Sequence, residues 1–336
     1  MGSPDAGPRV VAMGGGHGLA ASLSALRRLT RRLTAVVTVA DDGGSSGRLR
    51  RELGALPPGD LRMAIAALAG SDPTGRIWAD LVQHRFGGHG ALAGHAVGNL
   101  MITGLAEMLD DTVAALDFVA RTVGAVGRVL PVSTVPLRIE ADVLGVDKDD
   151  PGRVRRIRGQ VAVATTPGRV VSVSLAPLEP PACPAAVDAV RDADVVVLGP
   201  GSWFTSVLPH VLVPELLDAL LATSAHRVVV LNLAPQPGET DGFSPEEHLR
   251  VLFEHAPELR VDTVIADVDS VVDTDALVST VTSLGATLVL APVAADDGSP
   301  RHDPARFADA LARVSGLGWS WAPAGSTTHG EAHEWR

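Results

Sequence analysis

Two adjacent carboxylates that run into a glycine- and serine-rich turn are the strongest chemical signal in the sequence. Asp41 and Asp42 follow the β-branched run 34–39 and lead directly into GGSSG at 43–47. Neighbouring side chains of an extended segment point to opposite sides, so we expect one of the two aspartates to face a given ligand atom. That carboxylate could hold a ribose hydroxyl or a divalent cation, or it could cap the turn as an Asx-turn.

Three further polar loops that contain glycine each follow a predicted strand. They read GGGHGL at 14–19, GPGSWFTS at 199–206 and NLAPQPGET at 232–240. Glycine lets the backbone approach a ligand, and the amides of a helix N-terminus favour a phosphate. The first loop lacks the last glycine of the dinucleotide fingerprint, because Leu19 stands there. Any one loop could be a simple turn, with Ser202 as a helix N-cap in the second, but four together favour a phosphate site.

Other polar residues could complete such a site. His95 and Asn99 stand four residues apart at the start of a predicted helix, where they could contact a base or sugar or serve as a structural cap. Arg62 follows the turn PPGD and is a candidate phosphate ligand, whereas the arginines at 48–51 fit a solvated helix face. Lys148 is the only lysine. Arginine must therefore supply any positive charge at the site.

Several enzyme classes are disfavoured by what the sequence lacks. The absence of tyrosine excludes short-chain dehydrogenase chemistry, and a Walker-type loop has no lysine available. Cys183 is the only cysteine, which excludes an internal disulfide and a cysteine-rich zinc site. The run 43–47 fits the G-x-S-x-G pattern of a hydrolase nucleophile elbow, but two aspartates separate it from the strand and would oppose an acyl oxyanion.

The order of elements predicts an α/β, Rossmann-like three-layer fold with a mostly parallel sheet. Strand-like runs at 9–13, 34–39, 195–198, 228–231, 261–268 and 286–293 alternate with helical stretches. Leucines between Leu19 and Leu33 recur at helical spacing. We expect a β-rich insert at about 128–177, a single domain over 9–320 and a loose tail at 321–336. Ligands of such sheets bind outside the carboxyl ends of the strands, where all four loops should lie.

Composition limits the setting of the protein. The 336 residues are 46% hydrophobic and carry a formal net charge of −11, which argues against a nucleic-acid partner. The N-terminus lacks a signal-peptide pattern, and no apolar run reaches the roughly 18 residues of a membrane span. We expect a soluble, cytoplasmic protein.

The sequence resembles the YvcK family, the gluconeogenesis factors, which are similar in fold to the 2-phospho-L-lactate transferase of coenzyme F420 synthesis. The resemblance covers about residues 9–314 and is carried, in order, by AMGGGHGL, VTVADDGGSSGRLRRELGALPPGDLR, HAVGNL, VLPVSTVPL, GPGSWFTSVLP, NLAPQPGET and RHDPARFA. The sequence departs from the expected pattern at His17, Met63, Pro235 and the pair Trp203 and Phe204. These changes bear on which ligand binds and how tightly.

The resemblance implies a binding protein for a UDP-sugar such as UDP-N-acetylglucosamine, with roles in cell shape, peptidoglycan precursor supply and growth on gluconeogenic carbon. It implies no cofactor and no established reaction; a homodimer and cell-division or cell-wall proteins are candidate partners. The alternative is a phospholactyl-type transferase, in which an aspartate would hold Mg²⁺. Motif matching places ligand contacts at Gly14, Gly15, Gly16, His17, Gly18, Asp41, Asp42, Asn99, Gly201, Ser202, Asn232, Gln236, Gly238, Glu239, Thr240, Arg301, His302 and Asp303. The loops themselves add Gly43, Ser45, Arg62, His95 and Gly199.

Overall fold

The large sheet has seven strands, all parallel. The computed structural model describes residues 7–147, 149–236, 238–314, 317 and 319, so the predicted tail lies outside the described residues. The strand order is β10-β9-β8-β7-β1-β2-β3. The strands are β1 (Val10–Gly14), β2 (Leu33–Val37), β3 (Arg128–Pro131), β7 (Val195–Leu198), β8 (His226–Val230), β9 (Thr263–Asp267) and β10 (Thr287–Ala291). Most are short, buried, β-branched runs, as expected of strands covered on both faces.

The order in which strands are added to the sheet reverses between β1 and β7, although all strands remain parallel. Val10 lies opposite both Leu33 of β2 and Val195 of β7, so the sheet grows outward from β1 on one side and from β7 on the other. Because crossovers between parallel strands are right-handed, helices α1 (Gly16–Leu26) and α9 (Pro214–Ala222) cover opposite faces. The predicted three-layer fold is confirmed, and in such folds ligands bind where the strand order reverses, which here is between β1 and β7.

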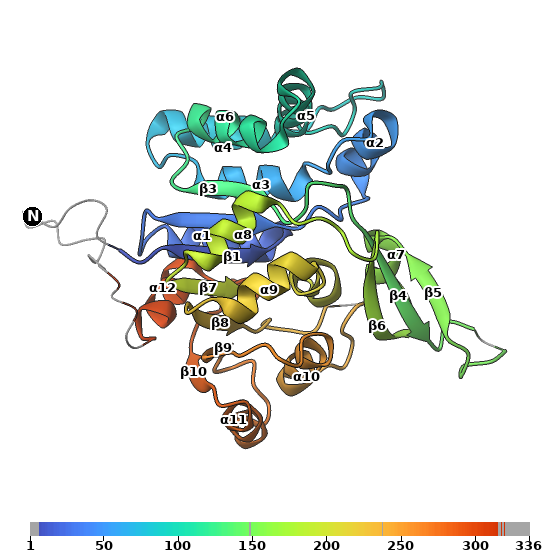
Figure 1. Cartoon of the computed structure of the whole chain (residues 1–336), viewed down its shortest axis with the longest axis vertical. Helices are drawn as coiled ribbons and strands as arrows, with labels where there is room; N and C mark the ends of the chain where they lie inside the picture. The colour runs from blue at the N-terminus through green and yellow to red at the C-terminus, as the bar shows by residue number, and fades with distance from the viewer. Residues whose placement is uncertain (1–6, 148, 237, 315–316, 318, 320–336) are drawn as a thin grey trace, which may run out of the picture.

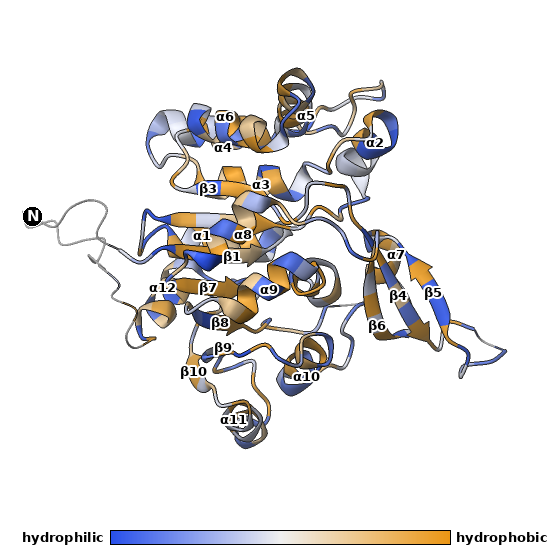
Figure 2. Cartoon of the chain, in the orientation of Figure 1, coloured by the Kyte–Doolittle hydropathy of each residue, from blue (hydrophilic) through white to orange (hydrophobic). Residues whose placement is uncertain are grey.

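The remaining helices extend these layers (Figure 1). Helix α1 packs against α3 and α12, α9 packs against α8, and α6 packs against β3. Figure 2 shows the enclosed strands as mainly hydrophobic and the outer helix surfaces as more polar. The helices are α2 (Gly44–Leu53), α3 (Gly59–Leu68), α4 (Pro73–Gln83), α5 (Val97–Leu109), α6 (Thr112–Thr122), α8 (Pro184–Arg191), α10 (Pro245–His255), α11 (Thr274–Ser283), α12 (Pro304–Ala312) and the short turns η1 (Trp203–Val207) and η2 (Leu208–His210).

The β-rich insert is a separate antiparallel sheet of order β5-β4-β6. It consists of β4 (Arg138–Leu144), β5 (Arg155–Arg158) and β6 (Arg169–Ala176), with the short helix α7 (Gln160–Ala164). The predicted start of the insert near residue 128 was wrong, because β3 pairs in parallel with β2 and belongs to the large sheet. The apolar residues of β3 are buried like those of the other parallel strands. The sequence pattern alone did not distinguish a short buried parallel strand from the start of an antiparallel meander.

The leucine pattern after Leu19 also extended too far. Helix α1 ends at Leu26, and Leu33 already begins β2. Leu29 and Leu33 are buried like the leucines of the helix. The regular leucine spacing therefore reflects buried positions that continue beyond the helix, through the turn and into β2.

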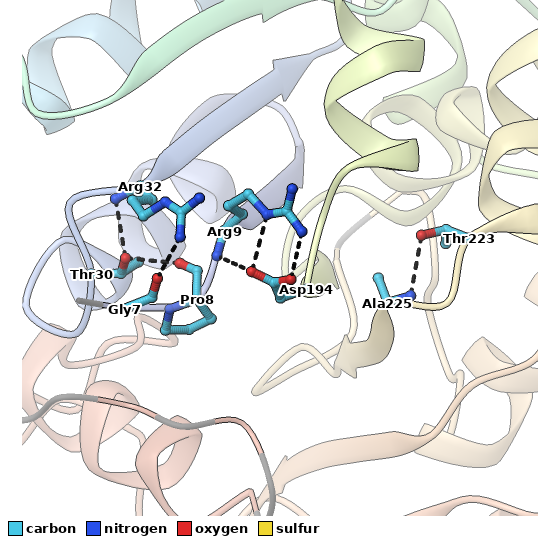
Figure 3. A network of polar contacts seen from close by, with 8 residues as sticks. All are labelled: Gly7, Pro8, Arg9, Thr30, Arg32, Asp194, Thr223 and Ala225. Carbon is cyan, nitrogen blue, oxygen red and sulfur yellow. Dashed lines mark hydrogen bonds and ion pairs between the residues drawn. The ribbon is translucent and has the colours of Figure 1, made fainter. Parts of the chain in front are cut away.

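The amino ends of the strands are joined by structural polar contacts, on the edge opposite the loops. The backbone N–H of Arg9 donates to Asp194 at 2.7 Å, and the Arg9 guanidinium donates to both oxygens of the same carboxylate (Figure 3). These contacts join the starts of β1 and β7.

Among the described residues no single helix is long and apolar enough to cross a membrane; only Trp203–His210 and Pro214–Ala222 taken together, across a 66° bend, meet that length and composition.

Candidate nucleotide-binding site

The loops that follow β1 and β7 touch at the centre of the carboxyl rim. A β-carbon built on Gly18 would overlap the carbonyl oxygen of Pro200 and lie 2.6 Å from the Cα of Gly201. Glycine is needed at position 18 because two backbones meet there. The structure thus brings the predicted loops 14–19 and 199–206 into direct contact at the point where the strand order reverses.

Asn232, at the end of β8, fixes the loop after β7. Its side-chain amide donates to the carbonyl oxygen of Gly201 at 2.8 Å, and its carbonyl oxygen accepts from the Gly201 N–H at 2.9 Å. Both polar ends of the amide group are therefore engaged with the loop. Asn232 therefore lies at the carboxyl edge of the sheet, as predicted, and its side chain positions the backbone of the loop after β7.

Four of the predicted polar residues form one buried chain of hydrogen bonds. Arg62 Nε donates to Asn99 Oδ1 at 2.9 Å, and Asn99 Nδ2 donates to Ser45 Oγ at 3.0 Å. The Ser45 hydroxyl lies 2.9 Å from Nδ1 of His95. Helices α2, α3 and α5 supply three of these residues, and His95 precedes α5 by two residues. Segments far apart in sequence thus meet in one polar cluster.

Arg62 is the buried cation of this cluster. It is 4% exposed, and burial lowers its pKa to about 10. Among the described residues, no carboxylate lies within ion-pair distance of Arg62. Burial also lowers the pKa of His95, which favours its neutral form. A buried guanidinium without a carboxylate partner is costly, and a phosphate would compensate it.

Asp60, the second residue of α3, was missed by the sequence interpretation, and its carboxylate lies against the N-terminus of α1. A β-carbon on Gly15 would be 2.5 Å from Asp60 Oδ2, and one on Gly59 would be 2.6 Å from Asp41 Oδ2. The Gly16 N–H lies near the Asp60 carboxylate and acts to lower its pKa. Burial, and then the nearby charge of Asp41, raise the pKa of Asp60 to about 7. A carboxylate therefore lies where the glycine loop was expected to present its amides to a phosphate. The sequence feature that could have indicated Asp60 is its place in the PPGD turn before a helix.

The carboxylate of Glu239 binds the backbone amides of the loop 199–206, which was also expected to bind phosphate. Its carboxylate accepts from the N–H of Phe204 at 2.7 Å, the N–H of Thr205 at 3.1 Å and the hydroxyl of Ser202 at 2.7 Å. Ser202 precedes η1 without a side-chain cap bond, and Glu239 satisfies those amides instead. Burial raises the pKa of Glu239. Any phosphate at this loop would have to displace that carboxylate.

Asp42 turns away from Asp41, toward the insert. Its Oδ1 accepts from the N–H of Val161 at 3.1 Å, and its carboxylate leaves no room for a β-carbon at Gly159. Gly238 approaches the carbonyl of Ala164 equally closely. Helix α7 therefore sits between the loop after β2 and the loop after β8. Of the two adjacent aspartates, Asp41 is the one that faces the rim.

The motif Arg301-His302-Asp303 lies at the same edge of the sheet, but its three residues have different roles. Arg301 is 71% exposed and pairs with Asp297 in its own turn at 2.5 Å. His302 is buried near Leu231, at the end of β8, and burial lowers its pKa to about 4. Asp303 accepts from two N–H groups as the N-cap of α12. Arg301 is the member of this motif with a side chain available to a ligand.

The remaining predicted residues shape turns. The Gly43 N–H donates to Asp41 Oδ1 at 2.9 Å, which is the Asx-turn alternative, and the Gln236 N–H donates to Thr240 Oγ1 at 2.8 Å. His17 is exposed on α1. Within the described ranges, no group of three or more histidine, cysteine, aspartate or glutamate side chains could hold a metal ion. Gly14 and Gly199 form the strand ends themselves.

Comparisons with known proteins agree with this fold. Residues 10–294 match the family model of 2-phospho-L-lactate transferase CofD. A Mycobacterium tuberculosis (strain ATCC 25618 / H37Rv) protein named "Putative gluconeogenesis factor" is 60% identical over 305 residues, 90% of this chain and 89% of that protein. The "Gluconeogenesis factor" of Listeria monocytogenes is 36% identical over 315 residues, 90% and 94% of the two chains. A crystal structure of a UPF0052 family member from Bacillus halodurans superposes with a TM-score of 0.80 at 31% identity, covering 90% of this chain and 98% of that one.

Proposed function

This chain belongs to the CofD family, within its gluconeogenesis-factor relatives, and from that membership and the rim geometry we propose that it binds a nucleotide diphosphate sugar of the UDP-N-acetylglucosamine type. The observation that carries the proposal is the buried Arg62, held by Asn99 and without a carboxylate partner among the described residues. Arg62 lies two residues after Asp60, which touches the loop after β1. Asp60 and Asp41 act on Arg62 only from beyond ion-pair distance, so a diphosphate at this rim would be its direct anionic partner.

The cellular role that we propose follows from the same ligand. A protein that senses a cell-wall precursor in the cytoplasm would link precursor supply to cell shape and to growth on gluconeogenic carbon. The names of the relatives support the gluconeogenic part. The cell-wall part rests on the resemblance and on the proposed ligand.

Replacing Arg62 by glutamine tests the proposed function. Glutamine removes the charge and keeps a donor for Asn99. We expect isothermal titration calorimetry to show binding of UDP-N-acetylglucosamine to the wild-type chain and a loss of about 1.5–3 kcal/mol in Arg62→Gln, as for a charged hydrogen bond. The matched control is Arg27→Gln, which removes the half-buried arginine at the C-cap of α1 that donates to the carbonyl oxygen of Ala67 on α3. Equal losses in both variants, or no binding by the wild-type chain, would contradict the proposal.

Arg301 provides a second, exposed cation. We expect Arg301→Ala to weaken nucleotide-sugar binding by about 1–3 kcal/mol, because the side chain can leave Asp297 for a phosphate at little cost. Unfolding by denaturant should be unchanged, since exposed ion pairs add little to stability. Unchanged affinity in the titration would remove Arg301 from the proposed site.

A transferase is the second candidate, and the pair Asp41 and Asp60 favours it. Mg²⁺ is commonly held by one or two carboxylates together with substrate phosphate oxygens and water. Asp60 Oδ2 is buried without a hydrogen-bond partner among the described residues, so the pair fits such an ion in charge and ligand type. Bound there, Mg²⁺ would neutralise phosphate charge during transfer. Product from a phospholactyl-nucleotide donor and a deazaflavin acceptor would establish this candidate; nucleotide-sugar binding without turnover would support the first.

A further inference from the structure

A cleft of about 390 Å³ opens at the carboxyl ends of β8 and β9. It lies between the loop that follows β8, the start of α10 and the loop before α11, and it begins at Asn232, which fixes the loop after β7. Its volume lies within the range of small-molecule sites. The residues of its wall include Asn232, Leu233, Phe243, Glu246, Val272 and Asp273.

The chemistry of the cleft suits an uncharged ring and excludes a phosphate. None of its lining residues is an arginine or lysine, whereas Glu246 and Asp273 contribute carboxylates. A diphosphate would meet like charge there. Most of the wall is apolar, with Leu233, Phe243 and Val272 among its members. Such a surface favours a flat, neutral group that can pack against apolar and aromatic side chains.

Two residues that line the cleft, His248 and Glu246, each carry a buried acceptor atom without a hydrogen-bond donor. His248 Nδ1 donates to the carbonyl oxygen of Ser244 at 2.8 Å, which leaves Nε2 as an acceptor in the neutral ring. The ring is held edge-to-face between Trp203 and Phe243. Both His248 Nε2 and Glu246 Oε1 are shielded from water and have no hydrogen-bond partner among the described residues. A buried acceptor of this kind is costly until a donor reaches it.

We propose that this cleft receives the heterocyclic base of the nucleotide ligand, with a ring N–H of the base directed toward the acceptors of His248 and Glu246. The sugar and diphosphate then run past Asn232 toward the contact between the loops 14–19 and 199–206. This assignment rests on the proposed function and adds to it the place and the chemical character of the base subsite. It separates an end of the site that is lined by apolar groups and hydrogen-bond acceptors from the cationic end at Arg62.

Val272→Trp tests the assignment without disturbing the core. Val272 is fully exposed (100%) and lines the cleft, so that an indole can fill the cleft from its mouth. The matched control is Val278→Trp, at a 43% exposed position of α11 that does not line the cleft. We expect the Kd of UDP-N-acetylglucosamine to rise at least tenfold in Val272→Trp and to remain unchanged in Val278→Trp. The Kd of inorganic pyrophosphate, which has no base, should be unchanged in both variants.

The outcomes distinguish the subsite from the function. Tight nucleotide-sugar binding by the wild-type chain together with unchanged binding by Val272→Trp would overturn the base subsite and leave the proposed function standing. Equal weakening of pyrophosphate and nucleotide sugar in Val272→Trp would place the phosphates in the cleft and also overturn the assignment. Absence of nucleotide-sugar binding by the wild-type chain would overturn both.

Discussion

Gly18→Ala is expected to lower the free energy of unfolding by about 3 kcal/mol or more and to abolish nucleotide-sugar binding. The added methyl group would overlap the carbonyl oxygen of Pro200 and lie 2.6 Å from the Cα of Gly201. Both obstacles are backbone and cannot turn away as a flexible side chain would, and Asn232 holds Gly201 in place through two hydrogen bonds. The loops after β1 and β7 must therefore separate, which costs more than ordinary overpacking.

Urea denaturation measures the first effect and calorimetric titration at a temperature where the variant is folded measures the second. Gly104→Ala is the matched control, because the same change at this exposed position of α5 finds nothing within 4 Å. There we expect a gain of about 0.5–1 kcal/mol, from higher helix propensity and a less flexible unfolded chain. Wild-type stability in Gly18→Ala would show that the two loops do not meet as described.

The meeting of these loops could be anticipated from the sequence, because it follows from the sheet alone. Short β-branched runs that alternate with helical stretches predict parallel strands, and the carboxyl ends of parallel strands share one edge. The position of β3 was assigned wrongly for a related reason. Its three apolar residues, after the exposed Arg128, are also typical of a meander, and only its pairing with β2 shows which sheet it joins.

The roles of individual carboxylates could not be read in the same way. Asp60 and Glu239 occupy loop amides that sequence reasoning reserved for phosphate. Which carboxylate folds back onto a helix N-terminus depends on contacts between residues far apart in the chain, as does the link between Ser45 and Asn99. The adjacent pair Asp41 and Asp42 was expected to diverge, but only the structure shows that Asp42 holds α7. Motifs indicated where the site lies, while burial and long-range packing determine what each residue does there.

Asp60→Asn is expected to stabilise the protein above pH 7 by up to about 4 kcal/mol and to flatten its pH dependence. The pKa of Asp60 is raised from 3.8 to about 7 in the folded chain, mainly by burial and then by Asp41. Between these values the folded state binds one more proton than the unfolded state, so stability falls as pH rises from about 4 to 7. Some three pH units correspond to about 4 kcal/mol, a cost that asparagine cannot incur.

Urea denaturation from pH 5 to pH 8.5 measures this difference, and two variants delimit its cause. Asp41→Asn should lower the pKa of Asp60, because the neighbouring charge is removed, and should move the loss of stability to lower pH. Asp80→Asn, at an exposed position of α4, should leave the profile unchanged. A profile of Asp60→Asn that parallels the wild type would contradict the assignment of this titration to Asp60.

The same titration should govern binding. Above pH 7 an ionised Asp60 beside the loop after β1 opposes a phosphate, so the affinity for UDP-N-acetylglucosamine without divalent cations should fall as pH rises through 7 in the wild type. The affinity of Asp60→Asn should stay level over that interval. Added Mg²⁺ should restore binding to the wild type at pH 8 and do little for the variant, because the ion needs the carboxylate charge that asparagine lacks.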